Sequence, residues 1–182
     1  MAASQIPPQP SFASLSSSAS SSRYKQCPVG RTLERVGDPW SFLILRDAAQ
    51  GLTRFDQFEK SLGVAPNILT KRLAGLVESG LLEKRRYNER PPRYEYVLTE
   101  LGRDFQPVLT ALMAFGNRHF FPDGVASALF DVETGLQAEP VLIDKVSGKP
   151  IDGGGFVYGA GPAAEQEVLD RVAFVAGKRD GA

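Results

Sequence analysis

The stretch from Thr53 to Arg93 constrains the fold of this chain more than any other, because two helical patterns stand about a turn apart and a basic hairpin follows. Gly63 ends the first pattern, since glycine tolerates the left-handed conformation that follows many helices. Pro66 suits the first position of the second helix, where its missing N–H costs nothing. This order is typical of a helix-turn-helix followed by a wing, which enters and flanks a DNA groove.

The first helix of this pair is predicted to begin at Thr53. Thr53 followed by Asp56 resembles a capping box, in which a side chain accepts the backbone N–H groups that a helix start leaves free. Phe55, Phe58 and Leu62 recur at helical spacing and give the helix one apolar face.

The second helix is predicted over 66–79, with Gly80 after its end. Its buried stripe carries four apolar residues: Leu69, Leu73, Leu76 and Val77. The opposite face offers Asn67, Thr70 and Lys71, which are side chains able to reach base edges and phosphates.

The hairpin is predicted from a strand at 81–87, a turn at 88–92 and a returning strand at 93–98. Residues 81–93 carry five Lys/Arg against two Glu, a net charge of +3. Taken alone, such a hairpin is equally well explained as a solvated one whose charges keep it soluble. Because it directly follows a helix-turn-helix pattern, we favour contact with DNA phosphates or the minor groove.

Charge is distributed unevenly along the 182 residues, although the formal net charge is zero. Residues 23–122 carry 16 Lys/Arg and 11 Asp/Glu, whereas 123–182 carry 5 and 10, which gives net charges of +5 and −5. The single cysteine, Cys27, allows no intramolecular disulfide and fits a reducing cytoplasm. Neither a membrane span nor a signal peptide is expected from the apolar pattern.

Three regions are predicted along the chain. Residues 1–22 are rich in Ser, Ala and Pro and are expected to form a disordered arm. Residues 23–122 form the folded domain, in which Cys27-Pro28 and Asp38-Pro39 each begin a helix. Thr99 is expected to cap a later helix, which Pro107 should kink or split. Residues 123–182 form a C-terminal extension.

Several motifs of the folded domain together resemble the HxlR-type, MarR-like winged helix-turn-helix transcriptional regulators. These motifs are CPVGRTLERVGDPWSFLILRDAAQG, RFDQF, NILTKRL, ESGLLEKR and ERPPRYEYVLTELGRD, in that order over roughly 24–120. The resemblance implies a homodimeric repressor or activator whose helix 66–79 enters the major groove. Two positions depart from the family pattern: Ala65 stands where a Ser or Asp cap is common, and Pro39 replaces a basic residue.

The predicted fold class is mainly α with a small antiparallel β wing, an α+β winged helix-turn-helix, plus a small tail that contains a β-hairpin and ends in a short helix. The predicted partner is a double-stranded, palindromic DNA operator. The predicted DNA-binding residues are Thr53, Arg54, Pro66, Asn67, Thr70, Lys71, Arg72, Arg85, Arg86, Arg90 and Arg93.

A second copy of the chain is the other predicted partner. Phe105, Leu109, Leu112, Phe115 and Phe120 keep one side of the helix after Thr99 apolar, and such a helix needs a partner. The resemblance implies that this partner is the same region of a second subunit, with help from the first helix, where Leu33 lies. Packing on its own domain is the alternative.

The C-terminal extension contains a weak repeat, in which FDVETGLQAEP at 130–140 parallels IDKVSGKPI at 143–151. The repeat suggests two turns joined by a strand through Val141, Leu142 and Ile143. The tails of some HxlR-like proteins carry cysteine pairs at this spacing, but here Asp131/Thr134 and Asp144/Ser147 stand there, so we expect no metal. Residues 163–176 are predicted to form a last helix.

Other functions find less support in the sequence. One His and one Cys, with no acid–base constellation, argue against an enzyme, and no cofactor is expected. A protein-interaction adaptor on the same scaffold would not need basic residues on both helix and hairpin. Cys27 lies where some relatives sense oxidants or electrophiles, and a helix N-terminus favours the thiolate. A redox-responsive repressor is therefore an alternative, as is control by an unidentified small-molecule effector.

Overall fold

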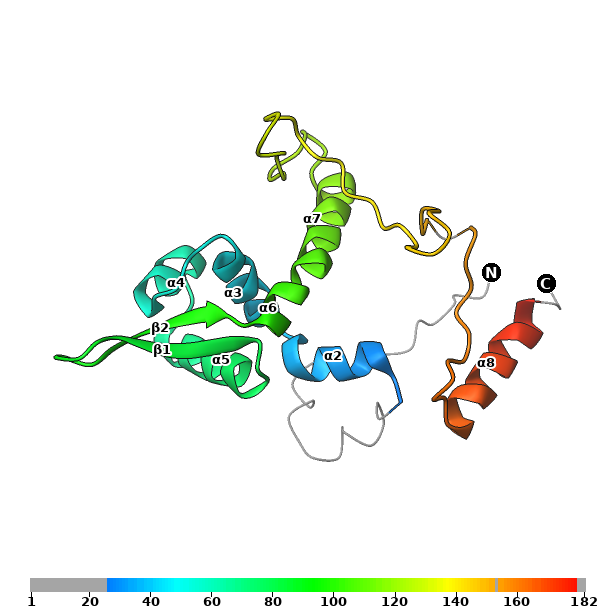
Figure 1. Ribbon diagram of the computed structural model, residues 1–182, viewed down its shortest axis with the longest axis horizontal. Coiled ribbons are helices and arrows are strands. Elements are labelled where there is room, and N and C mark those ends of the chain that lie inside the picture. Colours follow the sequence, from blue (N-terminus) through cyan, green and yellow to red (C-terminus); the bar gives the residue numbers. More distant parts are fainter. Residues whose placement is uncertain (1–25, 153, 180–182) are drawn as a thin grey trace, which may run out of the picture.

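The structure is a computed structural model that describes residues 26–152 and 154–179 (Figure 1). The predicted arm at 1–22 lies outside the described residues. The helices before the hairpin are α2 (Pro28–Val36), α3 (Pro39–Ala49), α4 (Phe55–Leu62) and α5 (Pro66–Glu78). The later elements are β1 (Leu82–Asn88), β2 (Arg93–Leu98), α6 (Glu100–Asp104), α7 (Gln106–Phe120) and α8 (Gln166–Arg179).

The starts of α2 and α3 follow the predicted cap-then-proline pattern. The Sγ atom of Cys27 accepts a hydrogen bond from the Gly30 N–H at 3.3 Å. Asp38 accepts one from the Ser41 N–H at 3.1 Å, and each cap is followed directly by a proline. Side-chain acceptors at these positions satisfy N–H groups that have no partner inside the helix.

The prediction that Thr53 caps α4 is wrong. The helix begins at Phe55, and the Oε1 atom of Gln57 accepts the N–H groups of both Thr53 and Arg54 at 3.0 Å. The Thr53 carbonyl oxygen accepts the Tyr96 N–H at 2.6 Å, so this residue extends alongside β2 instead. A contact with a strand more than 40 residues later displaced the local capping pattern.

The face of α5 that was predicted to be apolar is buried in the hydrophobic core. Leu69 and Leu73 are completely buried and Leu76 almost so, among residues that include Phe58 of α4 and Ile44 of α3. Gly63, with φ of 61°, occupies the left-handed conformation expected between α4 and α5. The helix-turn-helix is therefore built as predicted.

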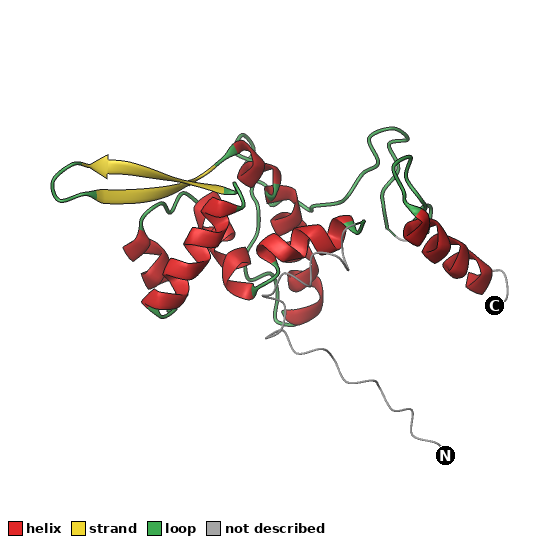
Figure 2. Cartoon of the chain, turned by 90° about the horizontal axis from the view of Figure 1, so that it is seen from below, coloured by secondary structure: helices red, strands yellow, loops and turns green. Residues whose placement is uncertain are grey.

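The wing is the antiparallel hairpin of β1 and β2, which projects well beyond the helices (Figure 2). Leu82 pairs with Leu98 at its base and Arg86 with Tyr94 further out. The register shifts between Arg86 and Asn88, close to the turn. The base of the wing is buried with the core through Leu82, whereas its outer part is exposed to solvent.

The helix after the wing is split at Pro107, as predicted. Thr99 Oγ1 accepts the Gly102 N–H at 3.0 Å and so caps α6, and α7 begins after Phe105. Phe105 itself is buried, with its ring centroid 5.5 Å from that of Phe42 in α3. Phe105 is therefore a core residue of its own chain, which leaves little of its side chain for the predicted dimer contact.

The C-terminal extension contains the two predicted turns. Asp131 Oδ1 accepts from Thr134 and Glu133, and Asp144 accepts in the same way from Ser147 and Val146. These hydrogen bonds stabilise the charged carboxylates and lower the pKa of both aspartates, with Thr134 and Ser147 as the principal donors. Each unit therefore forms a self-capped turn.

The strand predicted through 141–143 does not form. Each turn pairs only with its own flanks, through the bridges Phe130–Gln137 and Ile143–Pro150. Pro140, which has no N–H to donate, stands directly before the predicted strand. The last helix begins three residues later than predicted, at Gln166.

We expect Gly102→Ala to destabilise the fold by about 2 kcal/mol, because an added Cβ would overlap the Leu81 carbonyl oxygen at the junction of wing and α6. Gly75→Ala in α5 is the matched control: its Cβ meets nothing within 4 Å, and we expect up to about 1 kcal/mol of stabilisation. Urea unfolding followed by circular dichroism measures both. Equal effects of the two substitutions would contradict this account of Gly102.

Candidate nucleic-acid interface

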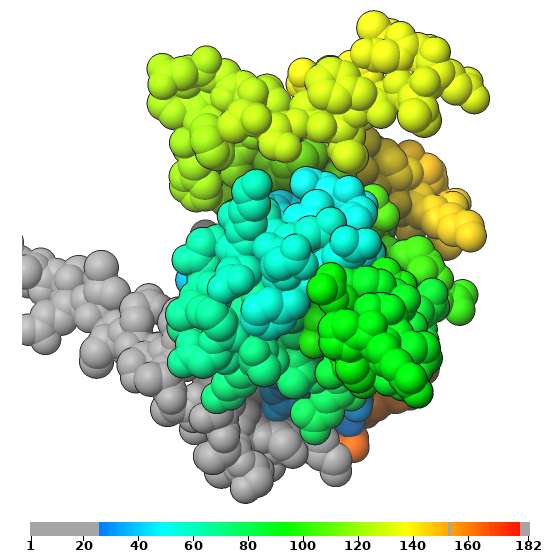
Figure 3. Space-filling view, turned by 90° about the vertical axis from the view of Figure 1, so that its left-hand side faces the viewer, coloured from blue at the N-terminus to red at the C-terminus, as the bar shows by residue number. Residues whose placement is uncertain are grey.

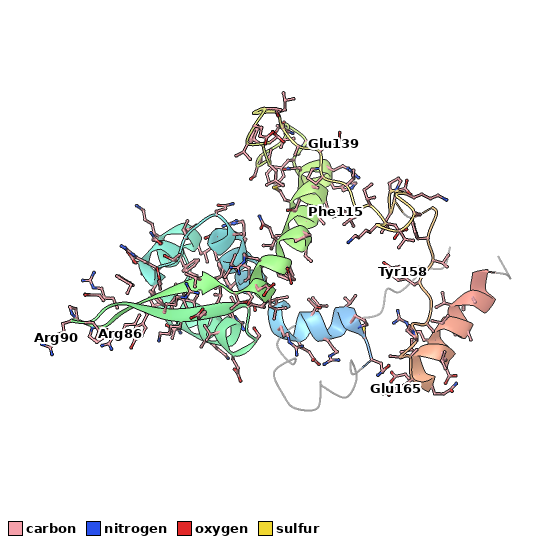
Figure 4. The ribbon with its side chains drawn as sticks, in the orientation of Figure 1. Arg86, Arg90, Phe115, Glu139, Tyr158 and Glu165 are labelled. Atoms are coloured by element: carbon pink, nitrogen blue, oxygen red, sulfur yellow. The ribbon has the colours of Figure 1, made fainter. Side chains whose placement is uncertain are left out.

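The helix pair α4–α5 and the wing lie on the same face of the molecule (Figure 3). Because the opposite side of α5 is buried, its Asn67, Thr70 and Lys71 side chains are exposed on the outer surface. The wing then extends this surface outward, with Arg86 and Arg90 near its tip (Figure 4). The fold therefore brings together residues from two separate predicted groups.

Two polar side chains near the start of α5 are partly engaged by the helix itself. The Thr70 hydroxyl donates to the Pro66 carbonyl oxygen at 2.8 Å, which leaves its oxygen available as an acceptor. Asn67 Oδ1 accepts the Ile68 N–H at 2.9 Å, which leaves the amide NH₂ as a donor. Ala65 supplies no side-chain cap, so Asn67 Oδ1 is the side-chain acceptor at the positive end of the helix dipole.

Arg72 differs from its exposed neighbour Lys71. Its Nε atom lies 3.1 Å from Oδ1 of Asp38, the residue that caps α3. The Arg72 side chain is about a third exposed. Because Asp38 caps α3, the ion pair joins α5 to the start of α3. The structure thus gives Arg72 a partner within its own chain, which the prediction of a DNA contact did not anticipate.

The basic side chains of the wing have acidic or aromatic neighbours. Arg85 pairs with Glu83 at 2.8 Å, and Arg86 lies 3.3 Å from Glu89. The hydrogen bond to Arg85 lowers the pKa of Glu83 and raises that of Arg85. All of these side chains are solvent-exposed, so their pairs contribute little to stability and can be exchanged for other anions.

Arg90 and Arg93 form no ion pair with any residue in the described part of the chain. Arg90 is at the extreme tip of the wing (Figure 4). Arg93 borders a shallow hollow of about 330 Å³ between the start of α4 and the wing, which Arg54 also lines. Two guanidinium groups at one hollow can bind a phosphate in bidentate fashion.

Two tyrosines, Tyr87 and Tyr94, contribute to this surface, although neither was predicted from the sequence as a site residue. Arg54 lies over the ring of Tyr87 at 4.9 Å, and the Lys84 ammonium lies over Tyr94 at 4.3 Å. These cation–π contacts hold the basic groups in place without neutralising them. The only signal in the sequence was the alternation of Tyr with Lys and Arg in the two strands.

The residues predicted for the dimer interface separate into two groups. Leu33 on α2 and Leu112, Phe115 and Phe120 on α7 are all at least half exposed. Leu109, in contrast, is half-buried against the core of its own chain, and Phe105 is buried within that core. Phe115, on α7, lies on the far side of the domain from the tip of the wing (Figure 4).

Cys27 is half-buried, and its sulfur serves as the cap of α2. Within 26–152 and 154–179, no three His, Cys, Asp or Glu side chains are grouped as metal ligands would be. Among the helices that the structure describes, none combines the length and the apolar character of a membrane span.

Sequence comparisons assign the family. The sequence profile of the HxlR-like helix-turn-helix matches residues 35–123. The uncharacterised HTH-type transcriptional regulator Rv3095 of Mycobacterium tuberculosis is 40% identical over 132 residues, which are 72% of this chain and 84% of that regulator. YdeP of Bacillus subtilis, also an uncharacterised HTH-type transcriptional regulator, is 33% identical over 101 residues, or 55% of this chain and 79% of YdeP. The chain belongs to the HxlR-like helix-turn-helix family and is a transcriptional regulator.

Solved structures agree with this assignment. PA1374, a candidate transcription factor from Pseudomonas aeruginosa, is 47% identical and superposes with a TM-score of 0.59 over 80% of this chain and 99% of its own. PA1607, another candidate transcription factor, is 38% identical, with a TM-score of 0.69 over 76% of this chain and 99% of its own. The winged helix-turn-helix fold predicted from the sequence is confirmed.

Proposed function

We propose that this regulator binds a specific DNA sequence as a homodimer in the cytoplasm, with α5 in the major groove and the wing against the flanking backbone or minor groove. The observation that carries the proposal is the position of the polar face of α5 beside the basic wing on one surface (Figure 3). An α-helix fits the major groove of B-form DNA, and a hairpin beside it can then follow the backbone.

The first turns of α5 suit the reading of bases. The free NH₂ of Asn67 is a donor and the Thr70 hydroxyl is an acceptor, so both can pair with base edges in the major groove. Lys71 can neutralise a phosphate. Ala65 provides no side-chain cap, and Pro66 has no N–H. Because the Ile68 N–H is already bonded, a phosphate oxygen can accept from the Asn67 N–H at the start of α5.

The wing supplies contacts that do not depend on sequence. Arg90 is free for a phosphate, and Arg85 and Arg86 can exchange their exposed glutamates for phosphates at small cost. Arg54 and Arg93 offer a second phosphate site between the start of α4 and the outer part of the wing. In this arrangement α5 supplies specificity and the wing supplies affinity.

A homodimer follows from the apolar surface of α7 and α2. Leu112, Phe115 and Phe120 are exposed on α7, and Phe115 lies on the side opposite the wing (Figure 4); Leu33 is an exposed apolar residue on α2. A two-fold dimer formed there would present two copies of α5 to half-sites about one helical turn apart. The operator would then be palindromic.

We expect Arg86→Ala and Arg90→Ala each to weaken binding by a similar factor on all DNA sequences and to reduce the slope of log affinity against log salt by about one. Asn67→Ala should instead lower the preference for the operator by about 1–3 kcal/mol. Fluorescence anisotropy with operator and unrelated duplexes measures both effects.

Lys149→Ala in the C-terminal extension is the matched control for the wing variants, because it removes one positive charge outside both the proposed DNA-binding surface and the proposed dimer surface. Its affinity and salt slope should equal those of the wild type. If the wing variants behave like this control, the wing does not contact DNA.

We expect Leu112→Asp to weaken dimerisation by at least about 2 kcal/mol, roughly 30-fold, because it buries a carboxylate in an apolar interface. DNA affinity should fall with it, since a monomer binds only one half-site. Leu136→Asp makes the same change at an exposed leucine of the extension and should leave the dimer intact. Sedimentation velocity that finds the wild type monomeric at micromolar concentration would refute the homodimer.

A further inference from the structure

The terminal helix α8 (Gln166–Arg179) has an apolar stripe that its own chain leaves partly uncovered. Val168, Val172 and Val175 recur at helical spacing, and Leu169 lies beside them. Leu169 and Val175 are more than 40% exposed. Both Figure 1 and Figure 2 show the body of α8 standing clear of the winged domain. An apolar stripe of this length needs a partner.

The end of α8 that touches the rest of the chain is its beginning. The Glu165 N–H donates to the Gln26 side chain at 3.2 Å, beside the start of α2. This contact brings the last helix next to the first described helix, which carries Leu33 of the proposed dimer surface. The beginning of α8 therefore lies near the beginning of α2, the helix whose Leu33 belongs to the proposed dimer surface.

The two ends of α8 differ in charge. Glu167, Asp170 and Arg171 lie in its first half, with a net charge of −1, and Lys178 lies near its other end. Glu167 and Lys178 are eleven positions apart in the sequence, which corresponds to three turns and about 16 Å along one flank of the helix. The same flank therefore presents an anion at one end and a cation at the other.

A second copy of α8 in antiparallel orientation complements this pattern. When the two helices are aligned about their midpoints, Glu167 stands opposite Lys178 of the partner subunit, and the two-fold axis repeats the pair at the other end. The valine stripes then face each other along the centre. A parallel arrangement would place like charges together at both ends, so the charge pattern selects the antiparallel one.

We propose that α8 pairs with α8 of a second copy, antiparallel and through its valine stripe, as a second contact of the homodimer. The pairing rests on the homodimer of the proposed function. Because α8 is linked to α7 through the extension, closing one contact raises the effective concentration for the other. The C-terminal extension thereby adds a second contact that strengthens the DNA-binding dimer.

The test uses charge reversal in the full-length chain. Glu167→Lys alone, or Lys178→Glu alone, places like charges opposite each other at both ends of the pair, and each variant should dimerise about tenfold more weakly at low salt. An equimolar mixture of the two variants restores both attractive pairs in the heterodimer, so it should associate about as tightly as the wild type. Sedimentation equilibrium measures the dissociation constants.

Glu133→Lys and Lys145→Glu are the matched controls, because they make the same charge changes in the extension outside α8. They should leave the dimer unchanged, and circular dichroism checks that all variants keep their helix content. Single variants that dimerise as tightly as the wild type, or a mixture that does not recover, would overturn the α8 pairing. A monomeric wild type would refute the homodimer itself. If the protein is dimeric but the charge-reversal variants have the same dissociation constant as the wild type, only the α8 pairing is overturned.

Discussion

Burial of one face of α5 is the constraint on which the rest of the proposed interface depends. Leu69, Leu73 and Leu76 are locked into the core beneath α3 and α4, and each buried leucine contributes roughly 1.5–3 kcal/mol. The helix cannot rotate without exposing them, so Asn67 and Thr70 must face outward. Packing thus fixes which side chains α5 can offer to a DNA groove.

The basic groups of this surface are positioned but not neutralised. Tyrosine rings support Arg54 and Lys84, and exposed glutamates hold Arg85 and Arg86 loosely. The exception is Arg72, whose charge is used within the domain to join α5 to α3 through Asp38. The cations therefore divide into one that stabilises the fold and several that remain available to an anionic partner.

Local chemistry explains what could be predicted from the sequence. Pro28, Pro39 and Pro66 each begin a helix, because a proline at the first helical position has little to lose. Helical spacing likewise identified the buried stripe of α5, and the Tyr-rich returning strand identified the wing.

Contacts between distant residues explain what could not be predicted. Thr53 joins β2 instead of capping α4, and Phe105 turns into the core to meet Phe42. The pairing of Arg72 with Asp38 also spans two helices. The central claim is that a two-fold dimer places two copies of α5 on adjacent major grooves. A hydroxyl-radical footprint on the DNA upstream of the protein's own gene tests this most directly. We predict two symmetric protected stretches about 10 base pairs apart, and a single protected stretch, or none at saturating protein, would contradict the account.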